Sequence, residues 1–315
     1  MQRQKPGSTL RYANLLKPKQ NFYFKCRKGF IFTIVQLFYL SSMEIKSLFN
    51  IDLCILIPYY NNVEGLIVAI NSISYNLDKY VIIIVDDGSN QLVSQEAISS
   101  KLTNKSNFTI IRLNQNQGIT KALNTGLNYI YNNFSAKYIA RLDCGDTCAP
   151  DRFFSQISFL ENNANIHLIG TWCYFEDKFS GETYKYITPT LHKDIEHSMN
   201  FRNVFIHPTV MWRVAGFDKL QYPVQYPYAE DYGLFYGMIS KVKTAIINEF
   251  LVCCEINHQG ISIKNRPIQL RSRLKVISDY GQNSFRFYLG AVKLRLLMLI
   301  PYQFILNTKK ILYKI

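Results

Sequence analysis

Short apolar runs alternate with stretches of helical spacing over residues 51–142. Four apolar runs bounded by turn residues predict strands at 51–58, 80–85, 108–113 and 138–142. Apolar residues recur every three or four positions over 63–77 and 119–132, which predicts helices, and a third helix is expected through about 92–102. Strands that alternate with helices are typical of βαβ units, so this half predicts an α/β, Rossmann-like and mostly parallel sheet flanked by helices.

The pattern changes after Pro150. A helix is expected over 151–162, and further strands and helical or loop segments follow without regular alternation. The strands are expected at 166–175, 183–188, 209–213, 244–247 and 250–256, and the helical or loop segments at 191–200 and 228–240. This irregular order predicts a mixed half that completes the site begun by the first half.

The stretch 285–306 mixes large apolar residues with Arg286, Lys293 and Arg295. The internal charges and Pro301 argue against a membrane-spanning helix. Two interpretations remain open, an interfacial amphipathic helix and a helix that packs on the domain.

The net charge of +14 is distributed unevenly along the 315 residues. Residues 1–50 contain nine Lys and Arg against one acidic residue, and residues 264–315 contain eleven against one, so the part between them is net negative. An acidic middle argues against a nucleic-acid groove through the fold. Basic ends rich in Tyr, Phe and Leu suit an anionic membrane surface, with solvated tails as the alternative.

The chain is expected to have three parts. Residues 29–42 form an apolar stretch that is too short to span a bilayer comfortably, and Met43 would make a natural start for the core. We expect residues 1–42 to be an upstream translational extension or a loose membrane-contacting leader, 43–263 to be the main domain, and 264–315 to be a basic, apolar tail. The seven cysteines show neither zinc-site spacing nor a disulfide framework, so reduced, cytoplasmic thiols are the simplest interpretation.

Two acidic clusters follow predicted strands. Asp86 and Asp87 come directly after the apolar run 81–84, and Asp143 and Asp146 follow 137–140. Ligands of open α/β sheets bind at the carboxyl ends of strands, so two such clusters predict a site for a metal-bound, phosphate-bearing ligand. Mg²⁺ or Mn²⁺ takes one or two carboxylates together with phosphate oxygens, which makes Asp143 and Asp146 candidate ligands. The arrangement points to an enzyme that acts on a nucleotide sugar.

Further candidates come from three other segments. Pro58, Tyr60 and Asn61 end the first strand and offer backbone groups and an aromatic face to a nucleobase. Glu230 and Asp231 precede a helical apolar run, where a carboxylate is held by the helix N-terminus. His258 lies in a polar loop after the last strand, from which it could reach a diphosphate or a metal, and His207 is a weaker candidate of the same kind. Ordinary turns, N-caps and structural histidines are the competing interpretations.

Together and in this order, six segments resemble the family 2 inverting glycosyltransferases with the GT-A fold. The segments are 57–61, 85–89, 116–124, 140–146 with Pro150 and Arg152, 230–232 and 258–262. The resemblance spans about 51–263; each motif is weak alone, but six in order are specific.

The resemblance implies a role for each candidate residue. Asp231 would be the catalytic base, with Glu230 beside it, and Asp143, Asp146 and His258 would hold Mg²⁺ or Mn²⁺. The nucleotide sugar, most simply a UDP-sugar, would be bound by Pro58, Tyr60, Asn61, Asp86, Asp87, Lys121, Arg141 and Asp143. The family commonly has Asp-x-Asp-Asp where this chain has Gly145 as the third residue, and arginine is frequent where this chain has Lys121. The first departure leaves Asp143 and Asp146 as the carboxylates of this motif.

The expected activity is transfer of a sugar, with inversion, to a glycan or lipid-linked acceptor of a surface polysaccharide such as lipopolysaccharide or capsule. The mixed second half would form the acceptor side. The enzyme would be cytoplasmic and peripheral on the inner face of the membrane, with no nucleic-acid partner. Two alternatives are a sugar-phosphate nucleotidyltransferase, disfavoured because 59–65 is not a Gly-rich, basic phosphate loop, and an inactive nucleotide-sugar-binding subunit.

Overall fold

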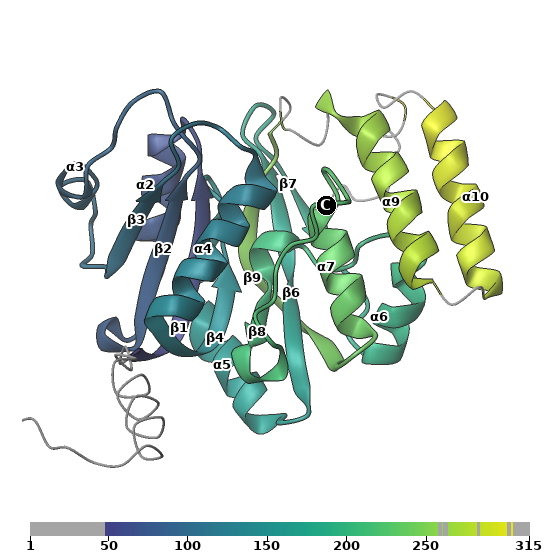
Figure 1. Cartoon of the computed structure of the whole chain (residues 1–315), viewed down its shortest axis with the longest axis horizontal. Helices are drawn as coiled ribbons and strands as arrows, with labels where there is room; N and C mark the ends of the chain where they lie inside the picture. The colour runs from purple at the N-terminus through teal and green to yellow at the C-terminus, as the bar shows by residue number, and fades with distance from the viewer. Residues whose placement is uncertain (1–47, 258–259, 261–263, 282–283, 301–303, 305–315) are drawn as a thin grey trace, which may run out of the picture. The chain divides into compact units, whose positions relative to one another are not determined.

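A mixed sheet of nine strands forms the centre of the fold in the computed structural model, which describes residues 48–257, 260, 264–281, 284–300 and 304. The strand order is β3-β2-β1-β4-β8-β6-β9-β5, and β7 pairs with β6 (Figure 1). The strands are β1 (Phe49–Tyr59), β2 (Tyr80–Asp86), β3 (Phe108–Arg112), β4 (Phe134–Arg141), β5 (Thr147–Cys148), β6 (Ile166–Asp177), β7 (Glu182–Tyr186), β8 (Met211–Arg213) and β9 (Lys243–Glu255). The leader expected at 1–42 and His258 lie outside the described residues.

The first four strands of the chain are parallel, whereas the second half is mixed. β1 pairs in parallel with β2 and β4, and β2 pairs in parallel with β3. β8 runs antiparallel to β4 and β6, while β9 runs parallel to β6. The α/β sheet with a parallel half and a mixed half is therefore confirmed, and the carboxyl ends of β1, β2 and β4 lie on one edge.

Helices cover both faces of the sheet. They are α2 (Val63–Asn71), α3 (Gln95–Ser99), α4 (Ile119–Asn133), α5 (Arg152–Asn162), α6 (His192–Met199), α7 (Glu230–Ile239), α9 (Arg266–Tyr280) and α10 (Phe285–Leu299). Alternate residues of β1 belong to two separate cores, as the period of a strand requires. Leu53, Ile55 and Ile57 pack with residues of α2 and α5, and Cys54 and Leu56 pack with residues of α4 and α7.

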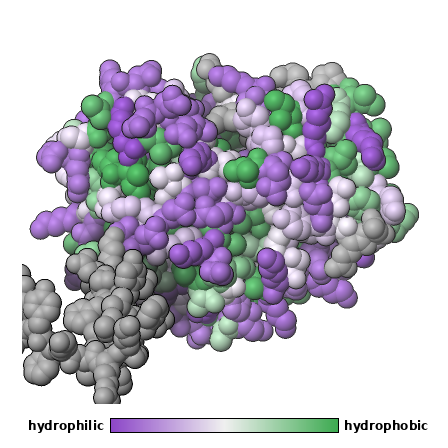
Figure 2. Space-filling model, viewed as in Figure 1, coloured by the Kyte–Doolittle hydropathy of each residue, from purple (hydrophilic) through white to green (hydrophobic). Residues whose placement is uncertain are grey.

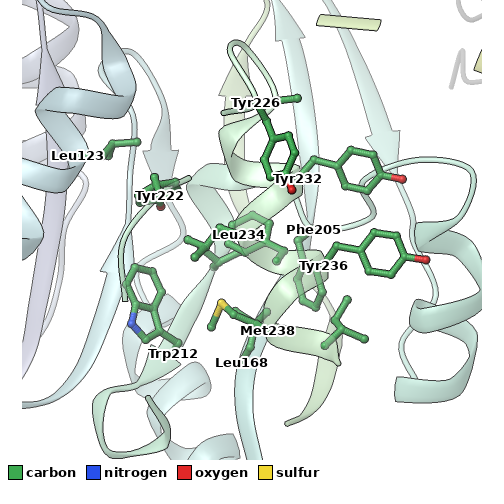
Figure 3. Packing of buried hydrophobic residues seen from close by; sticks show 14 of the residues in the cluster. Leu123, Leu168, Phe205, Trp212, Tyr222, Tyr226, Tyr232, Leu234, Tyr236 and Met238 are labelled. Carbon is green, nitrogen blue, oxygen red and sulfur yellow. The ribbon is translucent and has the colours of Figure 1, made fainter. Parts of the chain in front are cut away.

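The second core is rich in aromatic residues and surrounds α7. Trp212 of β8, Leu168 of β6 and Met238 of α7 pack together in it (Figure 3). Tyr222 and Tyr232 are also buried there. This packing holds α7 against the sheet, and the buried Tyr232 holds its first turn.

Two of the differences from the sequence expectation have local physical reasons. The helix expected over 63–77 ends at Asn71, because the hydroxyl of Ser72 donates to the carbonyl of Ala69 at 2.7 Å and competes with the helical pattern. The two strands expected at 244–247 and 250–256 are one strand, β9, in which Asn248 and Glu249 are exposed. Its register against β6 shifts between Thr171 and Cys173, so the polar pair interrupts the apolar pattern without ending the strand.

Two helices form the described part of the expected tail and lie side by side, at the opposite end of the sheet from β3 (Figure 1). α10 buries Gly290, Ala291 and Leu294. A Cβ at Gly290 would lie 1.9 Å from the carbonyl oxygen of Asn200, so only glycine allows this approach to the end of α6. Among the described residues, no helix combines the length and the apolar character needed to cross a bilayer.

Candidate active site

Asp86 closes the turn after β2 and links it to β3. Its Oδ1 accepts from the backbone N–H of Ser89 at 2.8 Å, and its Oδ2 accepts from the guanidinium of Arg112 at 2.7 Å. Arg112 also donates to the carbonyl of Ser89 at 2.6 Å. The carboxylate is nearly buried, so this ion pair fixes both the turn and the edge of the sheet beside it.

Asp87 fastens the turn that precedes α4. Its two carboxylate oxygens accept from the backbone N–H groups of Gln117 and Gly118 at 2.8 and 2.9 Å. The backbone N–H of Asp87 in turn donates to the carbonyl of Tyr59 at 2.8 Å. Each carboxylate oxygen has a second lone pair. Asp87 therefore has a structural task that leaves room for one further hydrogen bond per oxygen.

The end of β1 lies beside these turns. The backbone N–H of Asn61 donates to the hydroxyl of Ser89 at 2.9 Å, and the carbonyl of Pro58 accepts from the thiol of Cys144 at 3.3 Å. Tyr60 is 46% exposed, as a platform for a planar ligand would require. Lys121 is exposed on the first turn of α4. The structure thus gathers Pro58, Asn61 and the two aspartates at one edge.

Arg141 is the fully buried centre of a second group of residues at the end of β4. Its guanidinium donates to the carbonyls of Leu56 and Leu142 and to Oδ1 of Asp143. Its Nε donates to Nε2 of His207 at 3.1 Å. Arginine is a donor at every nitrogen, so these four partners leave it little freedom of orientation.

His207 accepts hydrogen bonds from two sides. The hydroxyl of Tyr222 lies 2.7 Å from the same Nε2 that accepts from Arg141. Because Arg141 can only donate, Nε2 is unprotonated and the ring proton is on Nδ1. Burial and the nearby charge of Arg141 lower the pKa of His207 to about 4, so the ring is neutral at physiological pH.

Asp143 and Asp146 differ in their electrostatic environment. Burial, the largest single effect, would raise the pKa of Asp143, but the charge and hydrogen bond of Arg141, together with smaller contributions such as the charge of Arg152, hold the pKa below its ordinary value. For Asp146, burial and the charge of Asp143 raise the pKa well above its ordinary value. The Oδ1 of Asp146 accepts from the backbone N–H of Glu255 at 2.8 Å, which attaches this loop to the end of β9.

Gly145 lies between these two aspartates in a conformation that favours glycine, with φ of +96°. A Cβ at this position would lie 2.6 Å from Oε2 of Glu255. The carboxylate of Glu255, which also pairs with Lys178 at 2.8 Å, therefore occupies the space next to the missing side chain. Where the family motif has an aspartate at this position, this chain has Gly145, and the carboxylate of Glu255 from β9 lies beside it.

Glu230 and Asp231 are the first two residues of α7, whose capping residue Ala229 has no side-chain acceptor. The Oδ2 of Asp231 accepts from the amide of Asn203 at 2.9 Å. Oε2 of Glu230 is buried and has no hydrogen-bond partner among the described residues. Burial, and then the charge of Asp231, raise the pKa of Glu230 to about 7.

The two acidic groups that lie far apart in sequence act on the same neighbours. The charges of Asp143 and Asp231 both affect His207, and the charge of Asp143 also affects Glu230. Arg112, Asn203, Tyr222 and Glu255 were not predicted from the sequence, and His207 was only a weaker candidate. Each of these residues stands alone in the sequence without the spacing of a motif, so only the folded structure shows that it lies at the site.

The donor set at the end of β4 fits a hard divalent cation. Asp143 and Asp146 each use one oxygen within the fold and have another available, and Mg²⁺ or Mn²⁺ takes one or two carboxylates together with phosphate oxygens. Among the described residues, no group of three or more His, Cys, Asp or Glu is arranged to hold a metal.

In comparisons with known sequences, the matching family model and relatives are all described as glycosyltransferases. The sequence profile described as "Glycosyl transferase family 2" matches residues 54–220. The amylovoran biosynthesis glycosyltransferase AmsE of Erwinia amylovora is 30% identical over 194 residues, which are 59% of this chain and 69% of AmsE. An uncharacterized glycosyltransferase of Methanocaldococcus jannaschii is 27% identical over 241 residues, which are 75% of this chain and 81% of that protein.

Among solved structures, residues 1–349 of S. aureus TarS have a similar fold. The TM-score is 0.55 at 14% sequence identity, with 78% of this chain and 70% of the TarS fragment covered. The same fragment in complex with UDP and with UDP-GlcNAc gives TM-scores of 0.54 and 0.53. At this identity the similarity establishes the fold.

Proposed function

This chain belongs to glycosyl transferase family 2, and on that premise we propose that it transfers a sugar, with inversion, from a nucleotide diphosphate to an acceptor hydroxyl. The observation that carries the proposal is the meeting of two acidic groups around one neutral histidine. Asp143 follows β4 and Asp231, 88 positions later, is the second residue of α7, yet the charges of both act on His207. Transfer between two substrates requires such a pair of groups, one for the leaving diphosphate and one for the attacking hydroxyl.

Asp231 is the proposed general base. The amide of Asn203 holds one of its oxygens and leaves the other for the proton of an acceptor hydroxyl. The deprotonated hydroxyl attacks the anomeric carbon from the face opposite the leaving nucleotide, which inverts the configuration. Glu230, with a pKa of about 7, is substantially protonated at neutral pH and adds little negative charge beside the base.

The strand ends bind the nucleotide part in this proposal. Asp86 and Asp87 would accept from the base and the ribose, Tyr60 would stack on the base, and Asn61 and Pro58 would shape the pocket. Lys121 and Arg141 would contribute positive charge near the diphosphate. Complexes of TarS with UDP and UDP-GlcNAc support a uridine nucleotide as the first donor to test.

Asp143 and Asp146 would hold Mg²⁺ or Mn²⁺ in this arrangement. When bound, such a cation neutralises the negative charge that develops on the departing diphosphate. The buried Arg141 keeps Asp143 ionised and oriented, whereas Asp146 has a raised pKa, which a bound cation would lower again. His258 remains a candidate ligand from the sequence alone.

The acceptor we propose is a lipid-linked or surface glycan. AmsE, whose name places it in amylovoran biosynthesis, supports an acceptor of the polysaccharide type. We extend the proposal to a peripheral position on the cytoplasmic face of the membrane, because the described part of the C-terminal region is basic and partly apolar.

Two measurements test this function. The thermal unfolding midpoint is followed with UDP-, GDP-, dTDP- and CMP-sugars, with and without Mn²⁺, since a ligand of the native state raises the midpoint by mass action. A metal-dependent shift with one nucleotide is expected, and no shift with any of them contradicts donor binding. Released nucleoside diphosphate, as opposed to pyrophosphate, is the product expected with an acceptor.

The role of Asp231 is tested by Asp231→Asn, for which a loss of turnover of about 10²–10⁴-fold is expected. Asp194→Asn is the matched control, because Asp194 is an exposed carboxylate in the first turn of α6. Equal activity of the two variants would exclude Asp231 as the base.

A further inference from the structure

The helix α10 exposes a continuous row of large apolar side chains. With 3.6 residues per turn, six of them fall in one sector of roughly 100°, which we call the apolar face of α10. They are Phe285 (76% exposed), Tyr288 (57%), Leu289 (44%), Val292 (51%), Leu296 (54%) and Leu299 (80%). Apolar side chains appear over α10 along the right-hand edge of Figure 2.

The opposite side of the same helix is fixed against the domain. Gly290, Ala291 and Leu294 are buried there, and the approach of Gly290 to Asn200 leaves no room for a Cβ. The guanidinium of Arg266 in α9 donates to the carbonyl of Leu297 at 2.5 Å. Because these contacts set the rotation of α10, the apolar face is directed away from the core.

Positive charge borders the apolar face on both sides. At 100° per residue, Arg286 and Lys293 fall on one border and Arg295 on the other, and all three are exposed. α10 contains no acidic residue. A face of this composition matches an interfacial helix, whose apolar side chains enter the lipid while its cations remain at the headgroups.

We propose that the apolar face of α10 docks on an anionic lipid bilayer, with Arg286, Lys293 and Arg295 at the phosphate level. The charge favours lipid over a second copy, because pairing two α10 helices through this face would bring the same cations together. The inference deepens the membrane contact proposed above and uses none of the residues assigned to catalysis.

Vesicle co-sedimentation tests this docking. The full chain is expected to bind vesicles that contain phosphatidylglycerol and to bind pure phosphatidylcholine vesicles much less, with binding falling as salt rises. Removing one bordering cation should weaken binding about fivefold. Leu296→Glu should weaken it at least about tenfold, because a buried leucine contact is replaced by a charge.

Leu92→Glu is the matched control, since Leu92 is 79% exposed and comes three residues before α3, a helix at the other end of the sheet from α10 (Figure 1). Equal vesicle binding by Leu296→Glu and Leu92→Glu would overturn the proposal, as would failure of the native chain to bind anionic vesicles. A dimer in light scattering that Leu296→Glu dissociates would identify a second copy as the occupant instead. Nucleotide-sugar binding without vesicles is expected to be unchanged in both variants, so a failure here is separate from a failure of the proposed function.

A second and independent observation concerns His207. This ring accepts from Arg141 at 3.1 Å and from Tyr222 at 2.7 Å, and it touches neither of the proposed reacting groups in any described hydrogen bond. Tyr222 is itself clamped, because the side chain of Asn124 in α4 accepts from its backbone N–H at 2.7 Å and donates to its carbonyl at 2.9 Å. A chain of contacts therefore runs from α4 to Arg141.

We infer that His207 is a positioning residue for Arg141, resting on the proposed function. The planar guanidinium is held on one side by two carbonyls and on its Nε side by His207 alone among the described residues. Its orientation decides where Asp143 presents the oxygen that is not bonded to Arg141. Without an acceptor at position 207, the guanidinium can turn and Asp143 turns with it.

Two substitutions at this position separate positioning from packing. His207→Phe keeps a ring and removes the acceptor, whereas the amide oxygen of His207→Gln can accept from both neighbours. We expect His207→Phe to lower kcat/KM for the nucleotide sugar by about 10–100-fold, as loss of an outer partner of a ligand does, and His207→Gln to stay within about threefold of the native value. Tyr222→Phe, which frees the ring on one side, should give an intermediate loss.

Rates are measured per mole of folded protein, with circular dichroism and the unfolding midpoint as checks. If His207→Phe is folded and as active as the native enzyme, or if His207→Gln is as impaired as His207→Phe, the positioning role is excluded. If His207→Phe does not fold, native activity of folded Tyr222→Phe excludes it. A native enzyme that binds no nucleotide sugar at all would instead contradict the proposed function.

Discussion

Restoring the aspartate that this chain lacks at position 145 should destabilise it. Gly145 has φ of +96°, and a side chain there would begin 2.6 Å from Oε2 of Glu255. Gly145→Asp therefore introduces a strained backbone conformation, a steric conflict and a second carboxylate beside the first. The expected cost follows from these contributions.

The backbone contribution is about 1–2 kcal/mol for an L-residue in the left-handed region. Two carboxylates roughly 4 Å apart repel by about 1 kcal/mol in water and about 4 kcal/mol near a protein surface. Lys178 pairs with Glu255 and reduces the repulsion, so a total of about 2–4 kcal/mol is expected. Since folded domains are stable by only about 5–15 kcal/mol, urea unfolding resolves such a loss readily.

A double-mutant cycle isolates the contact. Glu255→Ala alone should cost at most about 1 kcal/mol, because it removes a partly exposed ion pair. Combined with Gly145→Asp, it should recover the repulsive part and leave the backbone part, which gives a coupling free energy of about 1–3 kcal/mol. Unfolding is followed in urea with EDTA present. Additive costs of the two substitutions would refute the placement of Glu255 beside position 145.

Three further predictions concern other positions. Glu230→Gln should stabilise the fold by on the order of 2–3 kcal/mol at pH 8 and have no such effect near pH 4. Because the pKa of Glu230 is raised to about 7, the folded state binds more protons than the unfolded state between pH 4.5 and 7, so the stability of the native protein falls as pH rises through that window. Urea unfolding at several pH values measures the difference between the two proteins, and a difference that does not depend on pH contradicts the prediction. Arg141→Met should cost about 3–5 kcal/mol in urea unfolding, because Asp143 and two carbonyls lose their donor, and a loss below 1 kcal/mol would be inconsistent with a buried hub. Gly290→Ala should lower the free energy of unfolding by about 1–3 kcal/mol and increase amide hydrogen exchange in α10, because the new Cβ collides with the carbonyl of Asn200. Exchange rates in α10 equal to those of the native protein would show that α10 is packed less closely against Asn200.

Much of the sheet could be predicted from the sequence because its signals are local. The apolar run before Asp86 and the one before Asp143 each mark a buried strand and a carboxylate at its end, and parallel strands must bring such ends to one edge. The apolar run that follows Glu230 and Asp231 likewise indicated a helical or loop segment over 228–240, and the structure has α7 there. The family assignment and the fold are confirmed by the comparisons.

The contacts around these residues could not be predicted in this way. That His207 accepts from both Arg141 and Tyr222 depends on segments separated by 66 and 15 positions, which no periodicity connects. The carboxylate of Glu255 beside Gly145 depends on the register of β9 against β5. The helix α9 was hidden because its exposed charges dilute the apolar pattern on which a helix prediction relies. Long-range pairing, rather than composition, determines each of these features.

The two anchors of α4 restrict how this chain can change in length. Asp87 holds the backbone of Gln117 and Gly118 at the start of the helix, and Asn124 holds Tyr222 less than two turns later. One inserted residue between them would rotate Asn124 by about 100° and advance it by about 1.5 Å, so both anchors cannot be kept. Insertions and deletions between 118 and 124 should therefore be excluded from active variants, whereas residues 103–106, in the loop before β3, lie outside this constraint.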